Sequence, residues 1–288
     1  MNKEFDYIVI GAGIAGCCLA YFLSKYSKSI LLIDRNSQVA FGASGAAGAF
    51  LSPLLGKPND FKDLVTKSLI FSTNFYKNLG EELVSNCGVC RIPKNEEDRD
   101  KFESYKPYMD FKYTQMNDGY FFEIGSQVTP SLICEKLTKD IEKKLSYNVI
   151  KLEQNENSTW IINDEICAKN IILTTGADVK HIKEDYFDIR GVWGQKIDVS
   201  TTTETKINYH KECSVSKASK IEGSDLYKVS IGATHHKFNC DKNICNYCIE
   251  TANINACSRC YNDSIINNDS AKLIALANDI IKLGNVEV

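Results

Sequence analysis

Three glycines near the N-terminus have the spacing G-x-G-x-x-G, which is typical of a turn that binds the phosphates of a dinucleotide. Gly11 allows a tight turn, Gly13 lets the backbone approach a pyrophosphate, and Gly16 lets a helix pack closely on a strand. The backbone N–H groups at the start of that helix, at Ile14 and Ala15, would face the phosphate oxygens. The sequence therefore predicts a dinucleotide site here. A glycine-rich turn without a ligand is the alternative.

An acidic residue, Asp34, ends the next apolar run, at the distance where a carboxylate accepts hydrogen bonds from the adenosine ribose. Because this carboxylate would repel a 2′-phosphate, we do not expect NADP. FAD and NAD share the motif, and the small residues of 42–53 favour FAD, since backbone with few side chains can lie against a large flat ligand. Ser44 would act there as a hydroxyl donor. A flexible loop is one alternative, and an NAD-dependent dehydrogenase is another, although it leaves Ala43, Ser44 and Gly45 without a role.

Two CxxC pairs lie close together near the C-terminus. The candidate metal ligands are Cys240, Cys245, Cys248, Cys257 and Cys260. Four thiolates in this arrangement can close a tetrahedral site, so we expect a structural metal, zinc before iron–sulfur. A redox-active pair and ordinary thiols are the alternatives. The chain has 12 cysteines in 288 residues, and this fraction is well below the roughly 8–10% that is typical of a small disulfide-stabilised scaffold. We therefore do not expect the fold to depend on disulfide bonds.

The glycine turn requires a strand on either side of a helix, and the apolar pattern predicts them. Residues 6–10 and 29–33 are short apolar runs typical of strands buried on both faces. From residue 14 the spacing changes to that of a helix, whose expected buried face is Ala15, Cys18, Leu19, Phe22 and Tyr26. Residues 169–173 form a further buried strand, followed by a second small-residue turn at Thr175 and Gly176 on the same sheet edge. We interpret Cys17 and Cys18 as core residues.

The middle and the end of the chain carry weaker patterns. We expect helices over residues 64–83 and from Pro130 to about residue 145, and a strand over 147–152. Alternating runs at 194–199 and 226–231 predict antiparallel strands. A last amphipathic helix follows residue 270 and ends before Gly284, and residues 286–288 resemble the start of a strand.

Composition excludes several classes of protein. With 43% hydrophobic and 25% charged residues, the chain is neither disordered nor collagen-like. Its net charge of −3 gives no overall positive field for polyanions. The apolar run 7–23 lacks the basic flank of a signal peptide and falls short of the roughly 20 residues of a membrane span. We therefore expect a cytoplasmic protein that does not bind membranes, and we assign no oligomeric state.

Taken together, these motifs resemble a known family. The matching segments are Gly11 to Gly16, Asp34-Arg35, Ala43-Ser44-Gly45, residues 45–55, 87–89, 124–130 and 173–176, Ile189-Arg190-Gly191 with Gly194-Gln195, and residues 231–235. They look like the D-amino-acid-oxidase-type flavoproteins, and more closely like the FAD domain of the MnmC-type tRNA-modification enzymes. The resemblance implies an α/β fold, a Rossmann-like FAD-binding sheet interrupted by an α+β substrate domain with an antiparallel sheet.

The resemblance also implies a domain layout and a set of cofactor contacts. The FAD domain would comprise residues 1–56 and 124–182, and the substrate domain 57–123 and 183–288, with the cysteine knuckle at 240–260. The implied FAD-binding residues are Gly11, Gly13, Ile14, Ala15, Gly16, Asp34, Arg35, Ala43, Ser44, Gly45, Val149, Thr175 and Gly176. In this family Cys87-Gly-Val belongs to a segment that needs no metal, so we interpret the CxxC of Cys87 and Cys90 as a coincidence.

The activity implied by the resemblance is oxidation of 5-carboxymethylaminomethyl-uridine at the tRNA wobble position, releasing glyoxylate. A hydride would leave the glycine-like carbon for the flavin, and a methyltransferase acting on the same tRNA would be a separate chain. The family's final segment, with a Gly-x-Arg and flavin-ring contacts, has no counterpart here. We therefore expect either a truncated member or fragment, or a flavin-ring site that another chain completes, and we carry over no catalytic residue. Arg190 is a candidate carboxylate or phosphate ligand or a surface ion pair, and His235 and His236 are candidates for a general acid, a tRNA contact or a polar edge.

Two other functions remain open from the sequence. The first keeps FAD but replaces tRNA with a free amino acid, as in glycine or sarcosine oxidases. The second is an inactive fragment that acts as a metal-containing binding module for tRNA or protein. Lys237, Lys242 and Arg259 near the cysteines suit phosphate contacts, but a solvated charged face explains them equally well.

Overall fold

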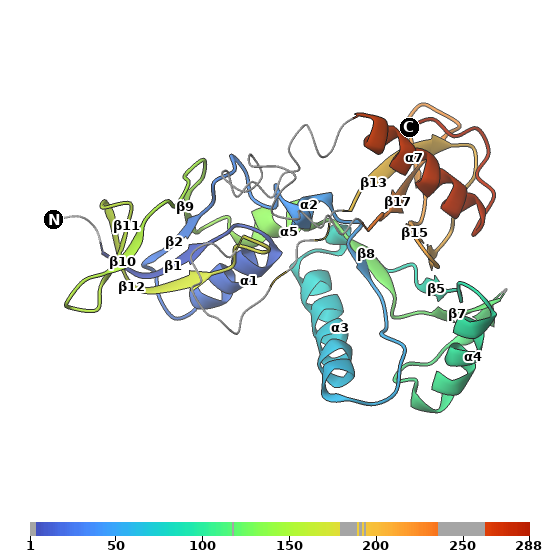
Figure 1. Ribbon diagram of the computed structural model, residues 1–288, viewed down its shortest axis with the longest axis horizontal. Helices are drawn as coiled ribbons and strands as arrows, with labels where there is room; N and C mark the ends of the chain where they lie inside the picture. The colour runs from blue at the N-terminus through green and yellow to red at the C-terminus, as the bar shows by residue number, and fades with distance from the viewer. Residues whose placement is uncertain (1–3, 117, 179–188, 190–191, 193, 236–262) are drawn as a thin grey trace, which may run out of the picture. The chain divides into compact units, whose positions relative to one another are not determined.

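The computed structural model describes residues 4–116, 118–178, 189, 192, 194–235 and 263–288 (Figure 1). The chain divides into two compact units. Among the described residues, the first unit contains 4–46, 130–178 and 189, and the second contains 47–116, 118–129, 192, 194–235 and 263–288. The predicted domain boundary at residue 56 therefore differs from the observed one at 46. Residues 47–56 go with the second unit because β3 (Phe50–Leu51) pairs with β8 (Ser126–Val128) there.

A six-stranded sheet forms the centre of the first unit, in the order β10-β11-β12-β1-β2-β9. Its strands are β1 (Glu4–Ile10), β2 (Ile30–Ile33), β9 (Glu142–Lys144), β10 (Leu152–Gln154), β11 (Trp160–Ile162) and β12 (Ile166–Leu173). The four strands β12, β1, β2 and β9 run parallel, while β11 and β10 continue the sheet antiparallel. The predicted β-α-β unit is confirmed, with α1 (Ile14–Leu23) between β1 and β2.

Alternate residues of these strands fill cores on both faces of the sheet. Ile8 and Leu31 belong to one buried cluster, while Val9 and Leu32 belong to the other, against which α1 packs. The predicted face of α1 is wrong in part. Its buried residues are Gly16, Cys17 and Ala20, while Ala15 and Tyr26 are exposed. Cys17 is thus a core residue as predicted, and Cys18 is half-buried.

Two further predictions for the first unit need correction. The helix from Pro130 is α5 (Pro130–Leu137), which ends well before residue 145 because residues 142–144 pair with β2 as strand β9. Residues 147–151 form no strand. Their backbone is held by other groups: the N–H of Tyr147 donates to the carbonyl of Asp34 at 2.9 Å, and the N–H of Ile150 donates to the side chain of Asn163 at 2.9 Å. A strand begins only at β10.

The second unit contains an eight-stranded sheet in the order β13-β17-β15-β14-β5-β7-β6, with β16 paired to β17. Its strands are β5 (Val89–Arg91), β6 (Thr114–Met116), β7 (Gly119–Phe122), β13 (Lys196–Thr201), β14 (Asn208–His210), β15 (Ser214–Val215), β16 (Ser219–Lys220) and β17 (Tyr227–Gly232). A small sheet, β3-β8-β4, adds the strand β4 (Val84–Ser85). The predicted antiparallel strands are confirmed as β13 and β17.

The C-terminal helix packs on the eight-stranded sheet of the second unit. α7 (Asp263–Asn278) begins earlier than predicted, and its Leu273 and Ala277 pack against β13, β15 and β17. The chain then returns to β13, where Glu287 forms an antiparallel bridge with Ser200, so the predicted strand start is present as a single bridge. α2 (Ala43–Ala46) lies in the first unit, and α4 (Glu96–Tyr105) in the second.

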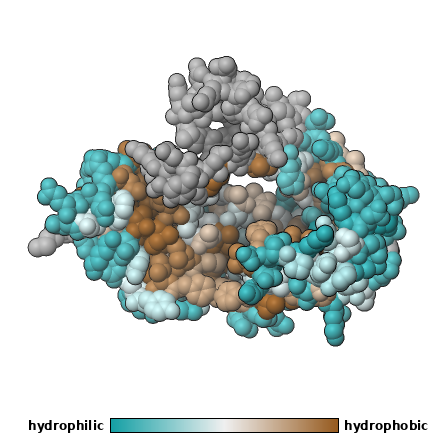
Figure 2. Space-filling view, turned by 60° about the horizontal axis from the view of Figure 1, so that its bottom comes forward, coloured by the Kyte–Doolittle hydropathy of each residue, from teal (hydrophilic) through white to brown (hydrophobic). Residues whose placement is uncertain are grey.

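The long helix α3 (Asp60–Leu79) covers the predicted 64–83 segment and is followed by a 3₁₀ turn at Glu81–Leu83. Lys62 anchors it, because its buried ammonium lies 2.6 Å from the Asp110 carboxylate and 2.6 Å from the Tyr108 carbonyl. Exposed large apolar side chains on α3 are Phe61, Leu64, Ile70 and Phe71. Hydrophobic residues also appear among hydrophilic ones on the face displayed in Figure 2. None of the helices in the described residues combines the length and apolar character needed to cross a bilayer.

Candidate dinucleotide site

The glycine-rich turn between β1 and α1 leaves no room for side chains. Gly11 has φ of +109°, and a Cβ there would lie 2.4 Å from the carbonyl oxygen of Thr174. A Cβ on Gly16 would lie 1.8 Å from the carbonyl oxygen of Gly11. The hydroxyl of Thr174 fixes the same point by donating to the carbonyls of Ile10 and Gly11 at 3.0 and 2.8 Å. Gly11 therefore allows the tight turn, and Gly16 allows α1 to pack closely on the strand, as the glycine spacing predicted.

Two backbone N–H groups of the turn meet side chains from other parts of the first unit. The N–H of Ala12 donates to Oδ2 of Asp34 at 2.7 Å. The N–H of Ile14, in the first turn of α1, donates to the hydroxyl of Ser44 at 2.9 Å. A Cβ on Gly13 would lie 3.1 Å from that hydroxyl, so glycine keeps the approach open. The structure thus gathers the turn, the acid at the end of β2 and the serine of α2 in one place.

The carboxylate of Asp34 is oriented by several hydrogen bonds. Its Oδ1 accepts from the backbone N–H of Asn36 at 2.8 Å and from the Asn36 amide at 2.9 Å. Of the roughly four acceptor positions of a carboxylate, Oδ1 uses two and Oδ2 uses one, so Oδ2 keeps one position open. Asp34 is only half-buried. The carboxylate is therefore held beside the glycine turn with one acceptor position on Oδ2 for a ribose hydroxyl.

The α2 segment holds the remaining small residues of the predicted site. Ser44 comes between Ala43 and Gly45, and a Cβ on Gly45 would lie 2.2 Å from the carbonyl oxygen of Ala40. The N–H of Ala40 in turn donates to the carbonyl of Ala12 at 2.8 Å. This bond ties the connection after β2 to the glycine turn. Ala43 and Ser44 are thereby positioned by backbone contacts rather than by large side chains.

The remaining predicted cofactor contacts, Arg35, Val149, Thr175 and Gly176, also belong to the first unit. Arg35 forms an ion pair with Asp178 at 3.1 Å, and the hydroxyl of Thr175 donates to the carbonyl of Asp178. Gly176, with φ of +64°, completes the turn after β12. Val149 is 5% exposed and belongs to the core cluster beneath β1, so only its backbone is suited to a ligand contact.

These groups fit a bound dinucleotide. The first turn of α1 and its dipole suit the pyrophosphate, Ser44 adds a hydroxyl, and Asp34 suits the adenosine ribose. At Gly11, Gly16 and Gly45 an added Cβ would clash with backbone atoms, so the backbone packs this closely only because these residues are glycine. We therefore regard Gly11, Gly13, Ile14, Ala15, Gly16, Asp34, Ala43, Ser44 and Gly45 as the residues that would hold the adenosine diphosphate part of FAD.

Polar residues also gather on one face of the eight-stranded sheet in the second unit. Arg91 of β5 is the register partner of His210 in β14. The Arg91 guanidinium donates to the Pro53 carbonyl at 2.8 Å, and its buried Nε has no hydrogen-bond partner among the described residues. Burial, followed by the positive charges of Arg91, Lys94 and His235, lowers the pKa of His210 to about 4. The predicted candidate His235 is exposed just after β17.

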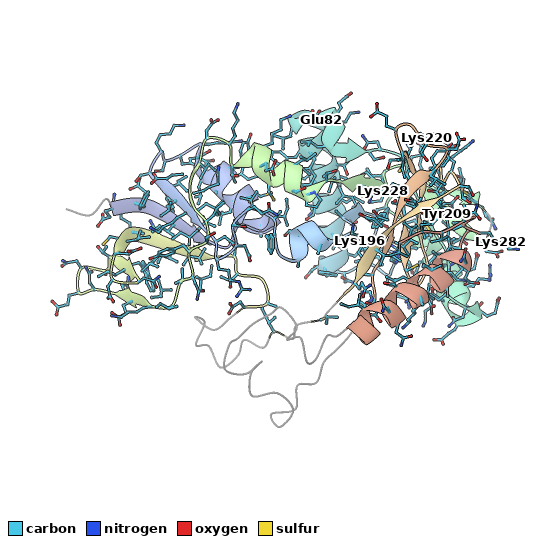
Figure 3. All side chains as sticks on the ribbon, turned by 90° about the horizontal axis from the view of Figure 1, so that it is seen from above. Glu82, Lys196, Tyr209, Lys220, Lys228 and Lys282 are labelled. Carbon is cyan, nitrogen blue, oxygen red and sulfur yellow. The ribbon has the colours of Figure 1, made fainter. Side chains whose placement is uncertain are left out.

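On the same sheet, the carboxylate of Asp198 forms ion pairs with two lysines. Lys196 of β13 and Lys228 of β17 approach Asp198 at 2.8 and 3.2 Å. Figure 3 labels the two lysines on these strands. Ser230 donates to the same carboxylate at 2.6 Å. Burial acts to raise the pKa of Asp198, but the hydrogen bonds from Lys196, Ser230 and Lys228 outweigh it and lower the pKa to about 2. These two lysines are therefore engaged within the protein.

Several predicted residues fall outside the part of the chain that the structure describes. They are Arg190, His236 and the five cysteines Cys240, Cys245, Cys248, Cys257 and Cys260. Within the described residues, no group of three or more His, Cys, Asp or Glu is placed to hold a metal. The Sγ of Cys87 and that of Cys90 contact different carbonyls, of Gly88 and Met116, and burial raises the pKa of Cys90 to about 11.

Sequence reasoning missed two residues that shape the dinucleotide site, Thr174 and Asn36, and a third, Arg91, that fixes the chain within the second unit. Thr174, rather than its neighbour Thr175, bonds to the glycine turn. Asn36 orients Asp34, and Arg91 holds the chain at Pro53. The Thr-Thr-Gly sequence after β12 contained the signal for Thr174, because a threonine directly after a buried strand adjacent to β1 is within reach of the turn. Asn36 and Arg91 had no distinguishing pattern.

A family model for FAD dependent oxidoreductases (DAO) matches residues 6–238. The chain belongs to this family. It is therefore an FAD-dependent oxidoreductase, and the predicted family and fold class are confirmed.

Among curated proteins, the chain is similar to the tRNA 5-methylaminomethyl-2-thiouridine biosynthesis bifunctional protein MnmC. The Campylobacter fetus subsp. fetus (strain 82-40) protein is 23% identical over 159 residues, which are 54% of this chain and 26% of that protein. The Legionella pneumophila (strain Lens) protein is 24% identical over 231 residues, 71% of this chain and 34% of that protein. The chain thus spans about a quarter to a third of the length of these relatives.

Solved structures share the fold. Glycine oxidase from Geobacillus kaustophilus aligns with a TM-score of 0.64 at 12% identity, covering 83% of this chain and 74% of that one. The dithionite-reduced L-alpha-glycerophosphate oxidase from Mycoplasma pneumoniae, with FAD bound, aligns with a TM-score of 0.65 at 17% identity, covering 81% and 72%. At this identity the likeness shows the fold alone.

Proposed function

We propose that this chain is the oxidoreductase part of a tRNA-modifying enzyme that oxidises the carboxymethylaminomethyl group of a wobble uridine. The observation that carries the flavin half of the proposal is the contact of Asp34 and Ser44 with the two N–H groups of the glycine turn. The tRNA half is supported by the similarity to proteins named for tRNA 5-methylaminomethyl-2-thiouridine biosynthesis. A direct substrate test decides this half of the proposal.

The proposed reaction breaks a carbon–nitrogen bond. When bound, FAD accepts a hydride from the carbon between the secondary amine and the carboxylate of the substrate. Water then supplies the oxygen of the glyoxylate that leaves, and 5-aminomethyl-uridine remains in the tRNA. The residues of this chain contribute binding: the glycine turn, Ser44 and Asp34 hold the cofactor. His235, Arg190 and His236 remain candidates for contacts with the tRNA.

A second candidate function keeps the flavin and the amine chemistry but uses a free amino acid. It is favoured by the fold likeness to glycine oxidase. Both substrates present a carboxylate on the carbon next to an amine nitrogen, so the same chemistry serves either. They differ in size and in polyanionic charge, and this difference makes them separable by experiment.

The test starts from the purified chain with added FAD. Visible absorption bands of a bound flavin are expected, and a chain that binds no FAD contradicts the flavin half of the proposal. The flavin-bearing chain is then incubated with tRNA carrying the carboxymethylaminomethyl group, and in parallel with glycine. Mass analysis of the tRNA nucleosides should show 5-aminomethyl-uridine. Turnover of glycine alone would favour the second candidate.

Two further predictions can be tested with the same sample. Metal analysis will show whether zinc accompanies the cysteines Cys240, Cys245, Cys248, Cys257 and Cys260. Adding a methyltransferase that acts on 5-aminomethyl-uridine should convert the product further, which would confirm that the released nucleoside is 5-aminomethyl-uridine.

A further inference from the structure

The second unit carries a polar groove that the proposed chemistry does not use. Its volume is about 520 Å³, within the roughly 300–1,000 Å³ of small-ligand sites. The polar side chains that line it belong to Glu82, Ser85, Asn86, Gln127, Thr129 and Lys217. Leu83, Val84 and Val128 add apolar surface. This lining differs from the mainly apolar lining of most small-molecule sites and suits a polar, charged ligand.

One wall of the groove is a lysine on a fixed backbone. The N–H of Lys217 donates to the side chain of Asn208 at 2.9 Å, and its carbonyl accepts from the hydroxyl of Ser216 at 2.9 Å. The next residue, Ala218, donates its N–H to the carbonyl of Thr205 at 2.8 Å. The Lys217 side chain is exposed. Its position is therefore set by the backbone, while its ammonium is presented to solvent.

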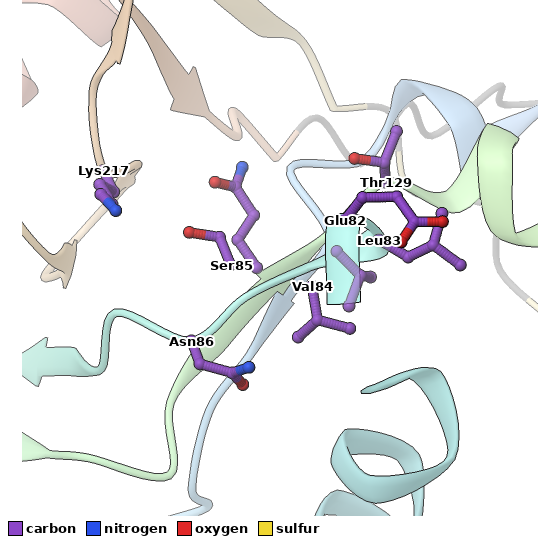
Figure 4. Close-up of a pocket in the computed structure, with 9 residues that line it drawn as sticks. Glu82, Leu83, Val84, Ser85, Asn86, Thr129 and Lys217 are labelled. Atoms are coloured by element: carbon purple, nitrogen blue, oxygen red, sulfur yellow. The ribbon is translucent and has the colours of Figure 1, made fainter. Parts of the chain in front are cut away.

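The opposite wall is the small sheet of β4 and β8. Ser85 is the register partner of Gln127, so their side chains lie on the same face. The Gln127 amide donates to the carbonyl of Gly48 at 3.0 Å, which orients it and leaves its oxygen as an acceptor. Asn86 directly follows β4 and is exposed. Figure 4 shows Lys217 across the gap from Ser85 and Asn86.

The charges divide the groove into two ends. Figure 4 shows Glu82 and Thr129 on the side away from Lys217. Unlike Lys196 and Lys228, which approach Asp198, Lys217 forms no ion pair with any residue that the structure describes. An anion would therefore bind at the Lys217 end, and neutral donors and acceptors would bind beside Asn86 and Gln127.

We propose that this groove binds a ribonucleotide of the tRNA other than the uridine being oxidised. The phosphate lies at Lys217, and the base edge faces the amides of Asn86 and Gln127. Lysine is a phosphate ligand, and side-chain amides offer the paired donor and acceptor that base edges require. None of the described residues that line the groove is aromatic, so we infer recognition through the base edge and the phosphate rather than through stacking. The inference rests on the proposed tRNA function.

The test measures binding of a fluorescently labelled anticodon stem-loop RNA to the full chain, by anisotropy over a range of salt concentrations. Lys217→Ala should weaken binding about three- to tenfold and reduce the salt slope by about one, as expected for one lost phosphate contact. Asn86→Ala should weaken binding with the salt slope unchanged. Lys220→Ala is the matched control, because Lys220 is an exposed lysine of the adjacent strand that lies over the Tyr227 ring and does not line the groove. It should bind as the wild type does.

The outcomes separate this inference from the proposed function. If the wild type binds the RNA and both groove variants bind it equally well, the groove inference is wrong and the tRNA function stands. If Lys220→Ala matches Lys217→Ala in both affinity and salt slope, a diffuse charge effect replaces the groove. If the wild type neither binds the RNA nor converts the modified tRNA, the tRNA function fails and the inference fails with it. Circular dichroism melting of each variant confirms that the fold is retained.

Discussion

Oδ2 of Asp34 lies 2.7 Å from the backbone nitrogen of Ala12, so the acid at the end of β2 accepts a hydrogen bond from the turn that follows β1. Asn36 holds the other oxygen through two further bonds. This relationship places the proposed ribose ligand and the proposed phosphate turn within one hydrogen bond of each other. Hydrogen bonds within the protein that fix the two groups in this arrangement reduce the ordering cost of binding.

Replacing Asp34 with asparagine should weaken FAD binding by about 10- to 100-fold. The change removes the negative charge, and hydrogen bonds to charged groups are worth about 1.5–3 kcal/mol, while the side chain keeps its shape. Quenching of flavin fluorescence during titration measures the affinity. Asp164→Asn is the matched control, because Asp164 belongs to the same unit and pairs only with the exposed Lys151 in the described structure. Equal affinity of Asp34→Asn and wild type would exclude a ribose role for Asp34.

Ser44→Ala should affect both the free chain and its cofactor binding. The N–H of Ile14 loses the acceptor it has at 2.9 Å, so the free energy of unfolding should fall by about 0.5–1.5 kcal/mol. FAD affinity should fall about tenfold because a hydroxyl donor beside the phosphates is lost. Urea unfolding and flavin titration measure the two effects. Ser37→Ala, an exposed serine before α2, should change neither. A Ser44→Ala chain with unaltered FAD affinity would place Ser44 outside the cofactor site.

Gly16→Ala should disrupt the turn. The added Cβ would lie 1.8 Å from a backbone oxygen of Gly11, which cannot move aside as a flexible side chain can. Overpacking of this kind costs about 1–3 kcal/mol or more, and it displaces α1 from the strand that presents the phosphate turn. A lowered melting temperature and loss of FAD binding are expected. Gly42→Ala is the control, since a Cβ there meets nothing within 4 Å. Similar melting temperatures for the two variants would refute the packing explanation.

The parts of the fold that the sequence predicted are those set by neighbouring residues. Glycine spacing and buried runs lie within about thirty residues around α1, so β1, α1, β2 and the acid of the site follow from local patterns. The face of α1 was predicted wrongly in part, because the helical spacing of the apolar residues from Ala15 to Tyr26 indicated a neighbouring stripe of the helix. In the structure, α1 packs so closely on the sheet that the small residues Gly16, Cys17 and Ala20 form its buried face.

The parts that the sequence did not predict depend on contacts between distant residues. Residues 147–151 have the apolar pattern of a strand, but Asp34 and Asn163 satisfy their backbone N–H groups and remove the need for a ladder. The pairing of Arg91 with His210 joins strands far apart in the chain. The groove likewise combines residues near 85, near 127 and at 217. No local pattern in a single sequence encodes such juxtapositions.

His210 should make stability depend on pH in a defined window. Its pKa in the folded chain is lowered to about 4, whereas an unfolded histidine titrates near about 6.5. The unfolded chain therefore binds more protons between these values, so stability is full above about pH 6.5 and is lost as the pH falls toward about 4. The loss should reach a few kcal/mol at most. Among the described groups, the lowered carboxyl pKa values act at lower pH, since they begin from 3.8 to 4.5.

Urea unfolding at about pH 7 and about pH 5 tests this prediction. The wild type should lose stability between the two, while His210→Gln should lose clearly less, because glutamine does not titrate and keeps a polar group near Ser214, whose hydroxyl lies 2.8 Å from the imidazole. The comparison is made as the difference between the two pH values within each protein, so any direct cost of the substitution cancels. If wild type and His210→Gln lose the same stability, the titrating group lies elsewhere and the burial of a neutral His210 beside Arg91 is not what makes the fold acid-sensitive.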